Sequence, residues 1–88
     1  MNFGAEKVDL SVVDFTPELL RYVPAEVARK YRVLPVFNRP GCLSIALSRA
    51  DDLNLIDNLA HILMQPGLEI LVADGQQLDL FIYRLYGN

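Results

Sequence analysis

Residues 33–48 read VLPVFNRPGCLSIALS, with two apolar runs on either side of a turn. Pro40 and Gly41 suit the two central positions of a type II turn, because proline restricts φ and glycine tolerates a positive φ. Residues 42–48 alternate, with Leu43, Ile45 and Leu47 on one face and small side chains on the other. This stretch predicts an antiparallel hairpin of residues 33–37 and 42–48, with helices packed closely over its small-residue face.

Two short helices are expected before the hairpin. Thr16 followed by Pro17 is typical of a helix start, because the hydroxyl can cap a free N–H and proline at the first position needs no donor. This helix ends near residue 22, and Pro24 opens a second helix that ends near residue 30. Their expected core side chains are Leu19, Leu20, Val23, Val27 and Ala28. Residues 1–15 are expected to form an extended N-terminal segment along the edge of a sheet or helix.

A helix, a strand and a last helix are expected after the hairpin. Asp51 and Asp52 complement the dipole of a helix that runs to about residue 64 and stops at Gln65-Pro66-Gly67. Residues 68–73 should lie parallel to the second hairpin strand after a helical crossover. Asp74 caps the last helix, with Gln77 as its capping-box partner. The two expected core stripes are Leu53, Ile56, Leu59, Ala60 and Leu63, and Leu78, Phe81, Ile82 and Leu85.

These elements predict one small α+β domain over residues 16–88, with the order αββαβα and a three-stranded mixed sheet. A chain of 88 residues, 52% hydrophobic and 22% charged, suits a single compact core. No apolar run approaches the roughly 20 residues that span a bilayer, and the N-terminus does not resemble a secretory signal. We therefore expect no direct membrane insertion and a cytoplasmic location.

Motifs for catalysis are missing from the sequence. It contains no Gly-x-x-x-x-Gly-Lys-Ser/Thr loop, so this chain alone cannot be a P-loop ATPase. His61 and Asp57 are one helical turn apart and are interpreted as a surface pair, and Cys42 as a small, partly buried strand residue. The net charge of −3 argues against a nucleic-acid partner. We expect no catalytic residue, no cofactor and no metal site.

Two groups of residues are candidates for binding. Arg21, Arg29 and Arg32 could hold an anionic ligand or an acidic partner, although the dipole at a helix C-terminus also favours cations there. Other candidates are apolar side chains that fall off the expected core stripes. They are Leu55 and Ile62 in the helix that ends near residue 64, and Leu80 and Tyr83 in the last helix. Either the N-terminal segment covers Leu80 and Tyr83, or these side chains meet another protein.

Between residues 8 and 86, a set of mostly structural positions matches the pattern of a known family. They are Pro17-Glu18-Leu19-Leu20, Val23-Pro24, Ala28, Tyr31, Val33-Leu34-Pro35-Val36, Leu43, Ile45-Ala46, Asp52-Leu53, Ile56-Asp57, Leu59, Gly67, Ile70 and Tyr86. At these positions the chain resembles the N-terminal, MshEN-like domain of type II secretion and type IV pilus assembly ATPases.

The resemblance implies an adaptor that docks an ATPase on the cytoplasmic part of an inner-membrane secretion assembly protein. ATP hydrolysis would then belong to downstream domains that this chain lacks. Some relatives instead bind cyclic di-GMP through paired helical motifs that begin with Arg-Leu-Gly, a tripeptide absent here. We expect a non-catalytic protein-interaction module and no nucleotide ligand; the alternative is a domain that senses cyclic di-GMP or another nucleotide.

Overall fold

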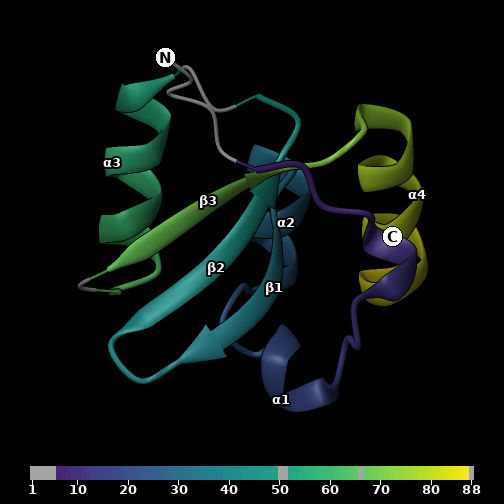
Figure 1. Cartoon of the computed structure of the whole chain (residues 1–88), viewed down its shortest axis with the longest axis horizontal. Helices are drawn as coiled ribbons and strands as arrows, with labels where there is room; N and C mark the ends of the chain where they lie inside the picture. Colours follow the sequence, from purple (N-terminus) through teal and green to yellow (C-terminus); the bar gives the residue numbers. More distant parts are fainter. Residues whose placement is uncertain (1–5, 50–51, 66, 88) are drawn as a thin grey trace.

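The computed structural model describes residues 6–49, 52–65 and 67–87, which form a three-stranded sheet with helices on both sides (Figure 1). The elements are η1 (Leu10–Val12), α1 (Pro17–Leu20), α2 (Ala25–Tyr31), β1 (Leu34–Arg39), β2 (Cys42–Leu47), α3 (Leu53–Ile62), β3 (Leu68–Val72) and α4 (Gly75–Tyr86). The predicted α+β domain is therefore confirmed. No helix in the described part of the chain is long and apolar enough to cross a membrane.

The sheet has the order β1-β2-β3, with β2 in the centre. β1 pairs with β2 in antiparallel orientation, and β2 pairs with β3 in parallel, Leu43 lying opposite Leu68. Gly41, in the hairpin turn, has a φ of 79°, the positive value that a type II turn requires at that position. Both the predicted hairpin and the predicted parallel neighbour are confirmed.

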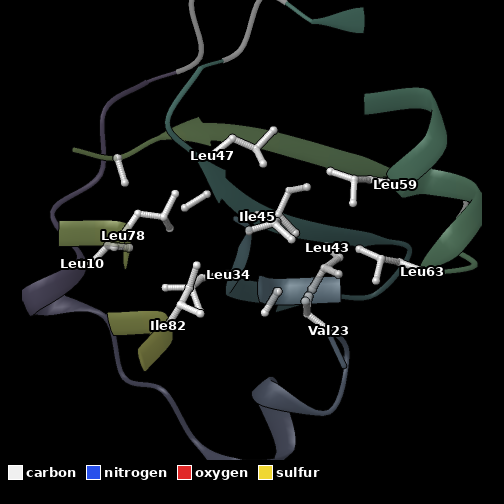
Figure 2. Close-up of a cluster of buried hydrophobic side chains, with 14 residues drawn as sticks. Leu10, Val23, Leu34, Leu43, Ile45, Leu47, Leu59, Leu63, Leu78 and Ile82 are labelled. Atoms are coloured by element: carbon white, nitrogen blue, oxygen red, sulfur yellow. The ribbon is translucent and has the colours of Figure 1, made fainter. Parts of the chain in front are cut away.

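The central strand β2 is buried on both faces. Its large side chains lie on the side of α3, where Figure 2 shows Leu59 and Leu63 near Leu43. On the side of α4, Leu78 and Ile82 lie near Leu34. Ser44 and Ala46 are buried on this second face, where their small volume allows a helix to approach closely. The sheet therefore has two apolar layers, one under each long helix.

The predicted helix caps are present. Thr16 Oγ1 accepts from the N–H of Leu19 at 3.1 Å, Asp52 Oδ1 from that of Leu55 at 3.0 Å, and Asp74 Oδ2 from that of Gln77 at 3.0 Å. Asp51 and Pro66, which were expected at the two ends of α3, lie outside the described residues.

The capping-box role predicted for Gln77 is wrong. Its side-chain amide contacts the N-terminal segment: Nε2 donates to Asp9 Oδ1 at 3.1 Å, and Oε1 accepts from the N–H of Leu10 at 3.1 Å. A capping box satisfies only local backbone groups, whereas this contact joins residues 67 positions apart. Gln77 therefore fixes the N-terminal segment to the start of α4.

The N-terminal segment runs beside the free edge of β3. Lys7 forms a parallel bridge with Val72, and the N–H of Val8 donates to the carbonyl of Val72 at 2.8 Å. The extended conformation was expected, but the turn η1 was not. Asp9 caps this turn by accepting from the N–H of Ser11 at 3.0 Å, and Leu10 becomes fully buried.

One expected core residue of α3 is exposed. Leu53 is 72% exposed, whereas Leu55 is half-buried and packs against the core. Leu53 is the first residue of α3, before the helix has reached the sheet, so its side chain lacks a partner layer. The apolar stripe that faces the sheet is formed by Leu55, Ile56, Leu59 and Leu63.

Candidate functional site

Two cavities meet where the parallel strands β2 and β3 end. The first, of about 450 Å³, is lined by residues 31–32, 47–49 and 52–55. The second, of about 870 Å³, is lined by residues 7–9, 48, 72–75 and 77. Ser48 lines both cavities. In open sheets with parallel strands, ligands bind outside the carboxyl ends of the strands, so this carboxyl-edge crevice is the candidate site.

The first cavity has the side chains that a nucleotide would need. Arg32 and Arg49 supply guanidinium groups, which bind phosphate oxygens in pairs of hydrogen bonds. Tyr31 adds an aromatic ring, which packs partly against the core and has Lys30 Nζ 5.4 Å from its centroid. Asn54 adds an amide that can both donate and accept hydrogen bonds. Its lining also includes one carboxylate, that of Asp52, which caps α3, so the described lining combines two guanidinium groups, one carboxylate, an aromatic ring and an amide.

The second cavity has the opposite charge balance. Among its described lining residues, Lys7 is the one cation, and Asp9 and Asp74 contribute two carboxylates. Hydrogen bonds from the Ser11 hydroxyl at 2.7 Å, from the Ser11 N–H and from Gln77 hold the pKa of Asp9 below its ordinary value. With two carboxylates against one cation in its described lining, the second cavity suits a phosphate less well than the first, which has two guanidinium groups against one carboxylate.

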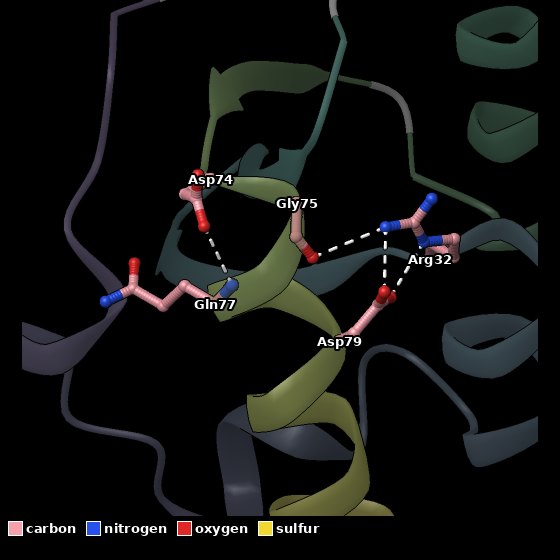
Figure 3. A network of polar contacts seen from close by, with 5 residues as sticks. All are labelled: Arg32, Asp74, Gly75, Gln77 and Asp79. Atoms are coloured by element: carbon pink, nitrogen blue, oxygen red, sulfur yellow. Dashed lines mark hydrogen bonds and ion pairs between the residues drawn. The ribbon is translucent and has the colours of Figure 1, made fainter.

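Arg32 lines the first cavity and contacts the N-terminal part of α4 (Figure 3). Its Nε is 2.8 Å from Asp79 Oδ1 and its Nη2 is 3.0 Å from Oδ2, so the pair is bidentate. Nη2 also donates to the carbonyl oxygen of Gly75 at 3.3 Å. The end of α2 is thereby joined to the first turn of α4.

The three arginines predicted to hold an anion do not form one cluster. Of these three, Arg32 alone lines the first cavity. Arg29 Nη1 contacts the carbonyl oxygen of Gly87, at the other end of α4, at a long distance of 3.5 Å. Arg21 is exposed at the C-cap of α1. Arg49 was overlooked in the sequence, where its place directly after the central strand was the available signal.

The four predicted partner-binding residues lie on two separate surfaces. Ile62 is 42% exposed on α3, while Leu80 and Tyr83 are 46% and 60% exposed on α4. Figure 1 shows these helices on opposite sides of the sheet. Leu55 packs partly into the core and lines the first cavity. A role for these residues in binding a protein stays a prediction.

The remaining candidates have ordinary environments. Asp57 and His61 are both exposed on α3, and Cys42 is half-buried. Within the described ranges, no group of three or more His, Cys, Asp or Glu side chains could hold a metal ion. Tyr86 is structural: its hydroxyl donates to the carbonyl oxygen of Val23 at 2.9 Å, and burial raises its pKa to about 12.

Comparison with known proteins decides the family. The family model of the MshEN domain matches residues 3–88. The chain belongs to the MshEN domain family. This MshEN domain is 31% identical over 87 residues to the type IV pilus assembly ATPase PilB of Myxococcus xanthus (strain DK1622), covering 98% of the chain but 15% of PilB.

A solved structure also resembles this MshEN domain. It is that of MshE with cdg, which is cyclic di-GMP, and it matches with a TM-score of 0.80 and 28% identity. The match covers 91% of this chain and 58% of the MshE chain. The predicted likeness to the domain of secretion and pilus ATPases is thereby confirmed, and the chain spans less than two thirds of both relatives.

The same structure corrects two expectations. The docking adaptor was ranked above nucleotide sensing, and no nucleotide ligand was expected; both predictions are wrong, because the structural neighbour is MshE with cyclic di-GMP. The absence of an Arg-Leu-Gly motif says nothing about the side chains around the carboxyl ends of the strands, which no local sequence pattern brings together.

Proposed function

We propose that this MshEN domain is a non-catalytic, nucleotide-sensing module whose ligand is cyclic di-GMP. The observation that carries the proposal is the likeness to MshE, at a TM-score of 0.80 over 91% of this chain, in a structure with cyclic di-GMP. In a pilus-type ATPase, such a module would report the concentration of a signalling nucleotide to a motor in another part of the protein. ATP hydrolysis would belong to that part, and the module would act in the cytoplasm.

The carboxyl-edge crevice supports this proposal. Cyclic di-GMP has two phosphates and two guanine bases, so its receptor must neutralise negative charge and contact flat rings. The first cavity offers Arg32 and Arg49 for phosphate and Tyr31 for a base. Arginine also recognises guanine through O6 and N7, which gives Arg49 a second way to bind this ligand.

Calorimetric titration of the chain with cyclic di-GMP tests the proposal. We expect saturable binding, and an Arg49→Ala variant that binds about tenfold more weakly, as for the loss of a charge-assisted hydrogen bond. Arg21→Ala is the matched control, because it removes the same charge from an exposed position that does not line either crevice cavity. We expect its affinity to equal that of the unmodified chain.

Two outcomes would contradict the proposal. An absence of heat with high micromolar cyclic di-GMP would rule out nucleotide sensing by this chain. Equal weakening by Arg49→Ala and Arg21→Ala would show only a general electrostatic attraction, which high salt would abolish.

A further inference from the structure

The guanidinium of Arg32 stands between a cavity and a helix. It lines the first cavity together with Tyr31 and Arg49, and it also binds both carboxylate oxygens of Asp79, directly after the first turn of α4. Any anion that enters the cavity and binds Arg32 therefore meets a group that already has an anionic partner. The structure thus connects occupation of the cavity to the contacts of α4.

Backbone geometry places Arg32 at this position. Arg32 is the C-cap of α2 and has a φ of 54° and a ψ of 60°, the left-handed conformation that turns the chain sharply toward β1. Across from it, Gly75 has no side chain, and a Cβ built there would lie 3.4 Å from Arg32 Nη2 and 3.8 Å from Ser48 Cβ. The ends of α2 and β2 therefore meet the start of α4 at close range.

The bond between Arg32 and Asp79 is of a kind that a phosphate can replace. The two side chains are 48% and 59% exposed, and ion pairs with this exposure contribute little to stability. A phosphate presents two oxygens to a guanidinium in the same bidentate geometry as a carboxylate does. Asp79 and a phosphate in the first cavity would therefore compete for one set of donors.

We propose that Arg32 is a latch residue that exchanges Asp79 for a phosphate of the bound nucleotide and so releases the first turn of α4 from α2. The inference rests on the proposed function and adds a regulatory step to it. Leu78 and Ile82 remain buried in the core and keep α4 on the sheet, so the change is confined to the exposed side of its first turn. The bound and free forms differ in which anion Arg32 holds.

Two substitutions with opposite expected effects test the latch. Asp79→Asn removes the competing charge, and we expect this variant to bind cyclic di-GMP about threefold more tightly. In the unmodified chain, binding must break an exposed ion pair, and the variant does not have this free-energy cost. Arg32→Asn removes the guanidinium and should weaken binding about tenfold. Asparagine tolerates the left-handed conformation, so this variant keeps the turn at the end of α2.

Glu69→Gln is the matched control. It removes one negative charge from the second exposed ion pair, Arg39 with Glu69, whose atoms are 2.9 Å apart at the hairpin end of the sheet. We expect its affinity for cyclic di-GMP to equal that of the unmodified chain. If Glu69→Gln binds cyclic di-GMP as tightly as Asp79→Asn does, the net charge of the chain alone determines the gain in affinity. That result would overturn the latch.

The remaining outcomes separate this inference from the proposed function. Binding by the unmodified chain with no change in Asp79→Asn would overturn the latch and leave nucleotide sensing intact. No binding by the unmodified chain would remove both. Amide hydrogen exchange adds a direct measurement: saturating cyclic di-GMP should accelerate exchange in the first turn of α4 of the unmodified chain, and it should leave Asp79→Asn unchanged.

Discussion

The two ends of the sheet differ in how closely they are packed. At the hairpin end, Gly67 lies against the turn so tightly that a Cβ would come within 2.7 Å of the Gly41 carbonyl oxygen. There the Leu43 N–H donates to the Gly67 carbonyl at 3.0 Å, and Glu69 accepts from the Ser44 hydroxyl. The carboxyl-edge crevice instead holds two cavities, and its ion pair joins separate helices.

This difference separates the structural role of one end from the binding role proposed for the other. Close backbone contacts at the hairpin end fix the register of β2 and β3. At the opposite end, the strands stop and their connections diverge to α3 and to α4, which leaves room for a ligand. Substitutions should therefore affect mainly stability at the hairpin end and mainly binding at the crevice.

The largest expected effect compares two leucines of β2. Leu43 and Leu47 are both buried, but Leu47 also lines the first cavity. Leu43→Ala should lower the free energy of unfolding by about 4 kcal/mol, because it leaves an empty space inside a packed core. Leu47→Ala should cost about 2 kcal/mol, since it enlarges a space that already exists. Urea denaturation measures both, and a larger loss for Leu47→Ala would contradict the proposed difference between the ends.

A smaller effect is expected from two glycines. Gly67→Ala should cost about 2 kcal/mol, because its Cβ meets backbone that cannot easily move. Gly75→Ala meets the tip of the Arg32 side chain at 3.4 Å and Ser48 Cβ at an ordinary contact distance of 3.8 Å, and it places alanine in a helix, so its cost should stay below about 0.5 kcal/mol. Thermal unfolding of the two variants beside the unmodified chain provides the measurement. Equal destabilisation would mean that the crevice is as tightly packed as the hairpin end.

The smallest effect concerns Asp9 at the crevice. The pKa of Asp9 is lower in the folded chain than in the unfolded chain, where it is about 4. The charged carboxylate therefore stabilises the fold above about pH 4, and this contribution is lost as the pH falls through the folded-state pKa. Asp9→Asn should therefore be less stable than the unmodified chain at pH 7, and the difference should shrink toward pH 2. Urea denaturation at the two pH values tests this. An unchanged difference would show that hydrogen bonding by Asp9 does not depend on its charge.

Functional inference from the sequence was correct for the family and wrong for the ligand. Positions such as Pro17, Pro24 and Gly67 maintain turns and close contacts, so they identify the fold and say little about what it binds. Residues of the first cavity come from α2, from the end of β2 and from the start of α3, and no single stretch of sequence displays them together. The likeness to MshE with cyclic di-GMP and the arginines of the first cavity favour a nucleotide instead.

The sequence by itself determined the hairpin and the caps at Thr16 and Asp74, because these depend on residues close together in the chain. The parallel third strand was predicted from the order strand, helix, strand, since such crossovers join parallel neighbours. Only the tertiary structure decided that Arg32 binds Asp79, 47 positions away, and that Gln77 holds Leu10, 67 positions away. Such contacts depend on how whole elements pack, and a polar side chain can satisfy its hydrogen bonds in many ways until packing selects one of them. The crevice also depends on tertiary packing, because its lining residues come from different helices and strands.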